Sequence, residues 1–285
     1  MEKEIIVGVS DFSLADTLEC GQCFRYWKVE EQEYLIASGQ KMIRVRQKEN
    51  ELTFYDASSE KVLNYWSNFF DINRDYGKLK QTLSAEDAIM AEAIAFAPGV
   101  HILKQDFFEC MISFILSQNN HIPRIKKMVE TLCQTYGTLL GEGRYGFPTA
   151  EQMQGATEEK LRELGMGFRA KYIMDAIKKA NSGQLPLADL VQMETEELRN
   201  KLLSIYGVGR KVADCILLFS FGRHEVFPTD VWVKRVMSYY YFQKEEVPLQ
   251  EIFQLAQEKY GDNAGFAQQY LFHYARKNGI GKKGG

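Results

Sequence analysis

The residues best suited to chemistry lie in the stretch 202–230, which reads LLSIYGVGRKVADCILLFSFGRHEVFPTD. Two glycines, Gly207 and Gly209, separate two apolar segments, and Lys211 follows the second glycine by two residues. Asp230 closes the stretch, nineteen residues after the lysine. Fewer than thirty residues therefore supply a candidate anion site made of backbone, an amine nucleophile and a carboxylate.

The two glycines and their apolar flanks predict a helix-hairpin-helix at about residues 196–221. Glycine tolerates positive φ and lets a foreign group approach the backbone. The second helix would begin with unpaired N–H groups and a positive dipole end, so a phosphate can bind there without any base being read. Arg210 and Lys211 directly after the turn favour this phosphate clamp over the alternative, a plain packing corner between helices.

Lys211 and Asp230 each allow a non-catalytic interpretation beside the catalytic one. The helix dipole disfavours an ammonium in the first turn, and a neutral lysine amine can attack an electrophilic sugar carbon and form a Schiff base. The alternative for Lys211 is a surface or phosphate-binding lysine, and for Asp230 it is a helix N-cap. Capping and catalysis are compatible, because backbone N–H groups would keep the carboxylate ionised and able to stabilise positive charge on a sugar.

Length and composition limit the class of protein. A chain of 285 residues fits about two domains. Apolar residues make up 45% and aromatic residues 13%, which supplies a buried core and argues against disorder. The N-terminus is acidic where a signal peptide would be basic, and no apolar run reaches about 18 residues, so we expect a cytoplasmic protein, nucleoid-associated if bacterial.

The cysteines are few and odd in number, which argues against a disulfide framework; they are Cys20, Cys23, Cys110, Cys133 and Cys215. The first two have the spacing of half a zinc site. A structural zinc ion needs four ligands, and the sequence has no second close pair. We therefore expect reduced thiols and no metal.

The overall charge is a poor match to a nucleic-acid-binding protein, which is usually basic. The formal net charge is −3 and the pI is about 5.9. The charge is uneven, however: residues 1–98 have a net charge of −6, whereas residues 199–235 have a net charge of +4. The field at a bound phosphate depends on the local excess of positive charge.

The pattern of apolar residues changes near residue 85. Residues 1–85 read as mostly strand, with four β-branched or aromatic runs separated by turn signals, at 24–29, 34–37, 42–46 and 52–55. After this point apolar residues recur at helical spacing, as at Phe107, Met111 and Phe114. The sequence therefore predicts an α+β fold, with an N-terminal antiparallel β domain over 1–85 and a helical core over 86–285.

At these motifs the chain resembles the 8-oxoguanine DNA glycosylases of the helix-hairpin-helix Gly-Pro-Asp superfamily, of the type shared by eukaryotes and some bacteria. The resemblance is densest at residues 19–27, 99–132, 164–172, 202–230 and 265–272. It implies a β domain packed on two helical subdomains, with duplex DNA in the cleft and the protein expected to be a monomer. It further implies a bifunctional enzyme of base excision repair. Lys211 would attack C1′, release 8-oxoguanine and form a Schiff base, β-elimination would nick the strand, and Asp230 would stabilise the transition state.

The resemblance also implies a base pocket. Gly21 matches the glycine whose carbonyl accepts a hydrogen bond from N7–H of the oxidised base. Guanine has an acceptor at N7 and cannot donate to this carbonyl, and a buried hydrogen bond left unmade costs about 1–3 kcal/mol. Gln268 and Phe272, four residues apart on one helix face, match residues that read the base edge and stack on its face. Three further residues match the pocket lining: Cys215, Pro228 and Asp230. By themselves, Gly21 fits a turn, Phe272 a core position and Cys215 a small buried thiol.

A second set of residues matches contacts to DNA outside the pocket. Asn119 would fill the hole left by the flipped base, and Phe168 would wedge beside the unpaired base. Arg124 and Arg169 would donate hydrogen bonds to the orphaned cytosine. The phosphate clamp would be made by two glycines, Gly207 and Gly209. Local sequence alone would favour a capped turn for the asparagine and a solvated face for the arginines.

The chain departs from the family pattern at three positions. Trp232 stands where a phosphate-contacting histidine is usual, Phe168 where tyrosine is usual, and Phe266 where tryptophan is usual. No cysteine follows Asp230, so the iron–sulfur cluster of relatives similar to endonuclease III is not expected. We expect no cofactor, although the backbone carbonyls of a hairpin of this type can hold a monovalent cation.

Two other functions remain open from the sequence. A monofunctional glycosylase for alkylated bases would activate water with the aspartate and would lack the lysine, so Lys211 favours the bifunctional reaction. A non-catalytic DNA-binding module would use the hairpin as a phosphate clamp and would need neither Lys211 nor Asp230; its binding would depend on salt and not on a lesion.

Overall fold

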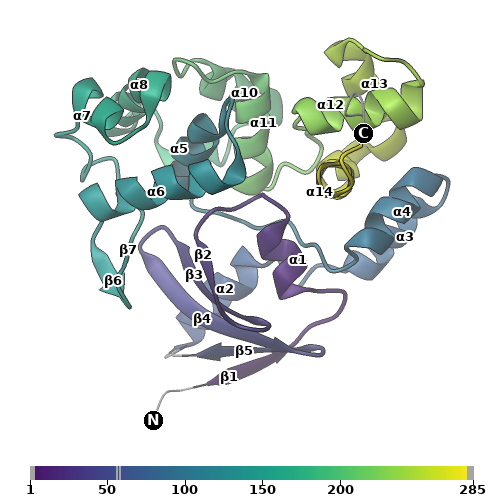
Figure 1. The fold of residues 1–285 in the computed structure, drawn as a ribbon, viewed down its shortest axis with the longest axis horizontal. Coiled ribbons are helices and arrows are strands. Elements are labelled where there is room, and N and C mark those ends of the chain that lie inside the picture. The colour runs from purple at the N-terminus through teal and green to yellow at the C-terminus, as the bar shows by residue number, and fades with distance from the viewer. Residues whose placement is uncertain (1–3, 56, 58, 281–285) are drawn as a thin grey trace.

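The N-terminal part of the chain forms one five-stranded antiparallel sheet. In the computed structural model, which describes residues 4–55, 57 and 59–280, its strands lie in the order β1-β5-β4-β3-β2 (Figure 1). The strands are β1 (Ile5–Gly8), β2 (Tyr26–Glu30), β3 (Glu33–Ser38), β4 (Lys41–Lys48) and β5 (Glu51–Tyr55). The four predicted strands are confirmed with small shifts in their bounds. The short edge strand β1, whose residues alternate between half-buried and exposed, was missed.

The prediction that residues 1–85 are mostly strand is wrong for three helices: α1 (Leu14–Glu19), α2 (Glu60–Phe69) and α3 (Tyr76–Ser84). Each begins at a capping side chain that accepts a hydrogen bond from the first turn, and the caps are Ser13, Ser59 and Asp75. Apolar side chains of α1 and α2 share one core with the inner residues of the sheet, including Leu18, Val45, Phe54 and Trp66.

The remaining helices form two lobes above the sheet (Figure 1). The first lobe contains α5 (Phe107–Ser117), α6 (Ile122–Tyr136), α7 (Glu158–Glu163), α8 (Ala170–Asn181), α9 (Leu187–Leu190), α10 (Thr195–Leu203), α11 (Arg210–Phe219) and the short hairpin β6 (Leu139–Gly141) and β7 (Arg144–Tyr145). The second contains α3, α4 (Ala88–Phe96), α12 (Val231–Val236), a π-helical turn (Met237–Phe242), α13 (Leu249–Tyr260) and α14 (Ala264–Asn278). The predicted α+β fold with two helical subdomains is confirmed. The domain boundary near residue 85 stays a prediction; α3 before it packs against α4 after it.

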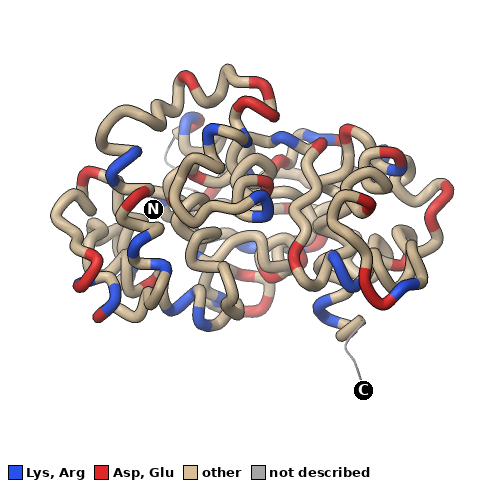
Figure 2. Tube along the Cα trace, turned by 90° about the horizontal axis from the view of Figure 1, so that it is seen from above, with Lys and Arg blue, Asp and Glu red and all other residues tan. Residues whose placement is uncertain are grey.

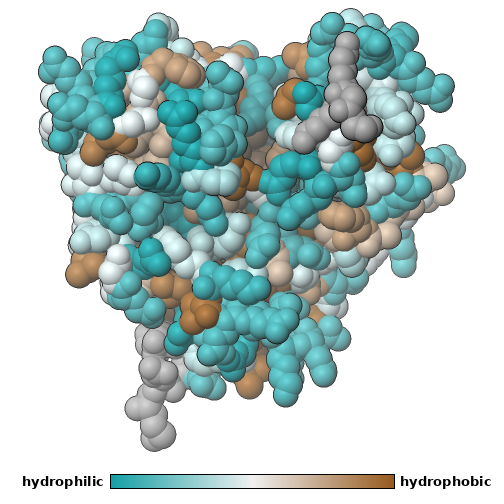
Figure 3. Space-filling view, in the orientation of Figure 1, coloured by the Kyte–Doolittle hydropathy of each residue, from teal (hydrophilic) through white to brown (hydrophobic). Residues whose placement is uncertain are grey.

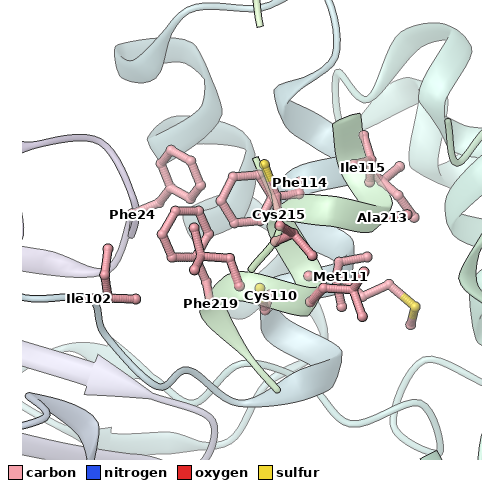
Figure 4. Close-up of a cluster of buried hydrophobic side chains, with 14 of the residues drawn as sticks. Phe24, Ile102, Cys110, Met111, Phe114, Ile115, Ala213, Cys215 and Phe219 are labelled. Atoms are coloured by element: carbon pink, nitrogen blue, oxygen red, sulfur yellow. The ribbon is translucent and has the colours of Figure 1, made fainter. Parts of the chain in front are cut away.

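An aromatic cluster joins the β domain to the first lobe beneath the site described below. Phe24, just before β2, makes an edge-to-face contact with Phe114 of α5, at 5.9 Å between ring centroids. Phe114 in turn stacks on Phe219 of α11, at 5.4 Å. Figure 4 shows these three rings grouped beside Cys215, so the cluster joins α11 to α5 and to the segment before β2.

A buried ion pair makes a second joint between the two parts. Arg25 Nη1 lies 3.0 Å from Glu109 Oε2 of α5, and the two side chains are only 2% and 8% exposed. Glu109 also accepts a hydrogen bond from the Gly39 N–H at 2.7 Å. The segment that carries Gly21 is thereby fixed to the helix that ends near Lys211.

Candidate active site

A pocket of about 380 Å³ lies where the two helical lobes meet the turn after α1. Figure 3 shows the hollow between the lobes on this face of the molecule. Its wall contains residues of α5, α6 and α11 from the first lobe and of α12 and α14 from the second, and it includes both Lys211 and Asp230. The amine and the carboxylate that the sequence singled out therefore line one cavity.

Lys211 occupies the first turn of α11, as predicted. Its Nζ donates a hydrogen bond to Ser117 Oγ at 3.2 Å, and Ser117 Oγ donates to the Phe114 carbonyl at 2.7 Å. The ammonium also lies 5.2 Å from the centroid of the Phe114 ring. These contacts with the end of α5 hold the amine at the pocket wall.

The predicted hairpin connects α10 to α11. Gly207 has a φ of +79°, and a Cβ at this position would lie 2.3 Å from ring atoms of Tyr172. Gly209 is the N-cap residue of α11 and has no side chain to satisfy the first N–H groups of the helix. Both glycines are thus explained, one by a close approach of α8 and the other by an uncapped helix start.

Asp230 caps α12, which confirms the structural interpretation of this residue. Its Oδ1 accepts hydrogen bonds from the backbone N–H groups of Trp232 and Val233, each at 2.9 Å. Both bonds use the same oxygen, so capping does not consume Oδ2. Asp230 can therefore act as a helix cap and as a charged group of the pocket at the same time.

All of the predicted base-pocket residues line this cavity, namely Gly21, Cys215, Pro228, Asp230, Gln268 and Phe272. Gly21 has a φ of +96°, a conformation that favours glycine. Gln268 is buried, and its Oε1 has no hydrogen-bond partner among the described residues. Burial raises the pKa of the Cys215 thiol to about 11, opposed in part by Lys211, so the thiol is neutral at neutral pH. The pocket thus offers an unused acceptor and a polarizable wall; the roles of these residues stay predictions.

The predicted DNA-contacting residues lie outside the pocket lining. Asn119 is exposed and has a φ of +47°, and the Phe168 side chain is 42% exposed. Arg169 is buried, and it donates to the carbonyls of Gln118 and Asn119, each at 2.9 Å. Burial and, secondly, the nearby Arg124 cation lower the pKa of Arg169. In this structure Arg169 shapes the loop that carries Asn119, a function that the sequence did not suggest.

The sequence interpretation missed several pocket residues, and two of them, Ser117 and Arg276, carry polar groups that contact the site. Arg276 follows Phe272 by four residues on α14, as Phe272 follows Gln268, so helical spacing could have found it. Ser117 had no such signal, because its contact with Lys211 joins two helices that are far apart in sequence. The departure at Trp232 also lies in the pocket wall, where the Arg235 guanidinium stands 5.1 Å from its ring.

Charge on the molecule is mixed. Figure 2, which looks down on the two lobes, shows Lys and Arg interspersed with Asp and Glu along the trace. The positive excess is a local property of the segment around the hairpin, as the sequence indicated. In the part of the chain that the structure describes, no helix has the length and apolar character needed to cross a membrane.

Comparisons with known proteins agree with this fold. The model of the HhH-GPD superfamily of base excision DNA repair proteins matches residues 112–261, and that of the 8-oxoguanine DNA glycosylase N-terminal domain matches residues 4–111. The 8-oxoguanine glycosylase/lyase of Clostridium acetobutylicum, solved with dsDNA containing cytosine opposite to 8-oxoG, is 38% identical, with a TM-score of 0.91 over 98% of this chain and 99% of that one. MBOgg1, solved with a low affinity DNA ligand, is 41% identical, with a TM-score of 0.93 over 97% and 96% of the two chains.

A plant relative extends the likeness. The N-glycosylase/DNA lyase OGG1 of Arabidopsis thaliana is 30% identical over 92% of this chain and 77% of its own length. Fold and site together define a DNA glycosylase of the helix-hairpin-helix class. The chain belongs to the 8-oxoguanine DNA glycosylase family within that class. The predicted enzyme class, a DNA N-glycosylase with lyase activity at abasic sites, is confirmed.

Proposed function

We propose that this enzyme removes 8-oxoguanine from duplex DNA, with cytosine as the preferred opposing base, and then cleaves the strand through a Schiff base on Lys211. The observation that carries the proposal is the placement of Lys211 and Asp230 in one pocket that also contains Gly21, Gln268 and Phe272. The base must leave the stack before it can enter such a pocket.

The chemistry follows from the positions of the two groups. The amine of Lys211 attacks C1′, the C1′–N9 bond breaks, and its electron pair leaves with the base, which takes up a proton. The sugar ring then opens to an imine with Lys211, and loss of a C2′ proton expels the 3′ phosphate. Asp230, whose Oδ1 accepts hydrogen bonds from the backbone N–H groups of Trp232 and Val233, stabilises the positive charge that develops at C1′.

Base recognition uses an acceptor that has no partner among the residues that the structure describes. Gln268 Oε1 is a buried acceptor without a described donor, and the edge of guanine carries N–H donors. The Gly21 carbonyl would accept from N7–H, Phe272 would stack on the base, and Cys215 and Pro228 would close the pocket.

The DNA contacts are proposed from the surface around the pocket. Asn119, which adjoins the pocket residue Asn120, and Phe168, which contacts Arg169, are exposed and would fill and wedge the duplex. Arg124, which lies near Arg169, and Arg169 itself would donate hydrogen bonds to the orphaned cytosine. For Arg169, these bonds would compete with those that it now makes to backbone carbonyls. Gly207 and Gly209 would hold a phosphate at α11. We place the enzyme with the chromosome, in the cytoplasm and on the nucleoid if the host is bacterial, acting as a monomer.

No resident cofactor is proposed apart from a monovalent cation at the hairpin. The carbonyls of Tyr206, Gly207 and Val208 accept no hydrogen bond from a described residue, so the hairpin has acceptors to offer. A cation there would add positive charge beside the phosphate. No iron–sulfur cluster is proposed, because no cysteine follows Asp230.

Borohydride trapping on a duplex with 8-oxoguanine opposite cytosine tests the proposal. We expect a covalent adduct with the wild-type enzyme, no adduct with Lys211→Gln, and an undiminished adduct with Lys61→Gln, an exposed lysine of α2. An adduct that survives Lys211→Gln would refute the role of this amine. Excision rates against the four opposing bases test the preference for cytosine.

A further inference from the structure

Arg276 is a pocket residue to which neither the motif nor the proposed chemistry gives a role. It follows Gln268 and Phe272 in a row of residues four apart on α14, and all three line the pocket. Its guanidinium carbon lies 5.3 Å from the centroid of the Phe272 ring, in a cation–π contact. The Phe272 ring, which is expected to stack on the base, is therefore also in contact with the Arg276 guanidinium.

The same guanidinium is seated on the turn that carries Gly21. Arg276 Nη2 donates to the Glu19 carbonyl at 3.0 Å, at the end of α1. A Cβ at Gly21 would lie only 2.9 Å from Arg276 Nη1, so this nitrogen fills the space beside the glycine. Burial lowers the pKa of Arg276, while Cys20, Tyr26 and Asp230 oppose that shift.

Most of the donors of this guanidinium have no partner among the described residues. An arginine carries five N–H donors and no acceptor. The hydrogen bond to Glu19 is the one that Arg276 makes with the described residues. A charged donor at the wall of a pocket is therefore left for a ligand that carries an acceptor.

The oxidised base has such an acceptor next to the atom that Gly21 would read. In 8-oxoguanine the N7–H donor is followed by the C8=O8 acceptor, whereas guanine has an acceptor at N7 and a C–H at position 8. Because Arg276 Nη1 occupies the space beside Gly21, an Arg276 N–H would set a donor next to the acceptor that the Gly21 carbonyl offers. This pair complements the lesion at both positions and complements guanine at neither.

We propose that Arg276 donates a hydrogen bond to O8 of the flipped base, and so both reads the lesion and assists its departure. When the C1′–N9 bond breaks, its electron pair stays on the base and is delocalised from N9 through C8 onto O8. A guanidinium at O8 stabilises this charge more in the transition state than in the bound substrate. The inference rests on the proposed function, because it takes the pocket at Lys211 as the site of 8-oxoguanine.

A cycle that changes both partners tests the contact. The substrate is changed from 8-oxoguanine to 8-thioguanine, which keeps N7–H but replaces O8 by a weak acceptor, and the protein is changed by Arg276→Met, which keeps an apolar stem. We expect Arg276→Met to slow single-turnover release of 8-oxoguanine about 10- to 100-fold, the range for a hydrogen bond to a charged group. Release of 8-thioguanine should change by no more than about threefold, since little of that bond exists to be lost.

Three controls separate this contact from a structural effect. Arg276→Gln, which keeps a donor, should recover part of the lost rate on 8-oxoguanine. Lys277→Met changes the exposed neighbour on the same helix and should leave both rates unchanged. Cleavage of a preformed abasic site, which contains no base to read, should be the same in Arg276→Met and the wild-type enzyme.

Two outcomes would overturn the inference. Equal losses on 8-oxoguanine and 8-thioguanine would assign Arg276 to the support of Phe272 and Gly21 alone, and an unchanged rate on 8-oxoguanine would remove any role in base release. Failure of the proposed function would look different, because the wild-type enzyme itself would then neither release 8-oxoguanine nor form a borohydride adduct.

Discussion

Replacing Gly21 by alanine should separate base recognition from strand cleavage. The residue has a φ of +96°, and an added Cβ would meet Arg276 Nη1 at 2.9 Å, Ile122 Cδ1 at 3.0 Å and Phe272 Cε1 at 3.2 Å. An L-residue in this left-handed conformation costs about 1–2 kcal/mol. The three contacts are with ends of side chains, which can move by a few tenths of an ångström, so we expect the variant to fold with that loss of stability.

The effect on base release should be larger than the effect on folding. A displaced Gly21 carbonyl and a shifted Phe272 ring would weaken the bond to N7–H, and a buried hydrogen bond left unmade costs about 1–3 kcal/mol. We therefore expect single-turnover release of 8-oxoguanine to fall about 10- to 100-fold. Cleavage of a preformed abasic site should stay within about threefold of the wild-type rate, because Lys211 lies on α11, outside this turn.

Gly165→Ala is the matched control for this prediction. Gly165 has a φ of +88°, close to that of Gly21, but a Cβ there would meet no atom within 4 Å. This variant should lose a similar free energy of unfolding in urea and keep its rate of base release. The reasoning is refuted if Gly165→Ala slows base release as much as Gly21→Ala, or if Gly21→Ala lowers abasic-site cleavage by the same factor as base release.

Three further predictions follow from the structure. Asp230→Asn keeps a good N-cap for α12, so the free energy of unfolding should change by less than about 1 kcal/mol, while base release should fall at least about 100-fold in a single-turnover assay. Burial lowers the pKa of His101 to about 4. As the pH falls below 6.5, this histidine is therefore protonated in the unfolded chain but stays neutral in the folded protein. Stability from this residue is therefore present above pH 6.5 and lost toward pH 4, by about 3 kcal/mol in total; urea unfolding of His101→Asn should show a flatter dependence in this window, and an unchanged slope would refute the assignment. Glu109→Gln leaves Arg25 charged and buried without its partner, so the free energy of unfolding should fall by about 3–5 kcal/mol. Glu158→Gln, in an exposed pair, should cost less than about 0.5 kcal/mol by the same measurement.

The errors of the sequence interpretation have a physical origin. Residues 60–69 carry Trp66 and Phe69, aromatic residues that favour strands, yet they form α2 because Ser59 caps the segment and its apolar side packs on the sheet. β1 is a four-residue edge strand, and its pairing with β5 comes from the distant partner and not from its own pattern. In both cases tertiary packing decided between local preferences that were close in energy.

The sequence by itself determined the features that depend on near neighbours. Runs of β-branched and aromatic residues separated by turn signals predicted the four strands β2 to β5. Gly207 and Gly209 with their apolar flanks predicted the hairpin and placed Lys211 in the first turn of a helix, because glycine conformation and helical spacing act over a few residues. The N-cap at Asp230 was equally local.

Only the tertiary structure decided which of these groups share a cavity. Gly21, Lys211 and Arg276 come from the β domain and from two different helical lobes, and no spacing along the chain relates them. They meet because the aromatic joint at Phe24 and the ion pair of Arg25 with Glu109 fix the β domain on the first lobe, and because Arg276 of the second lobe bonds to the end of α1. Such contacts depend on the packing of whole elements. Helical spacing could place Arg276 on the face of Gln268 and Phe272, but its contact with the Gly21 turn exists only in the folded chain.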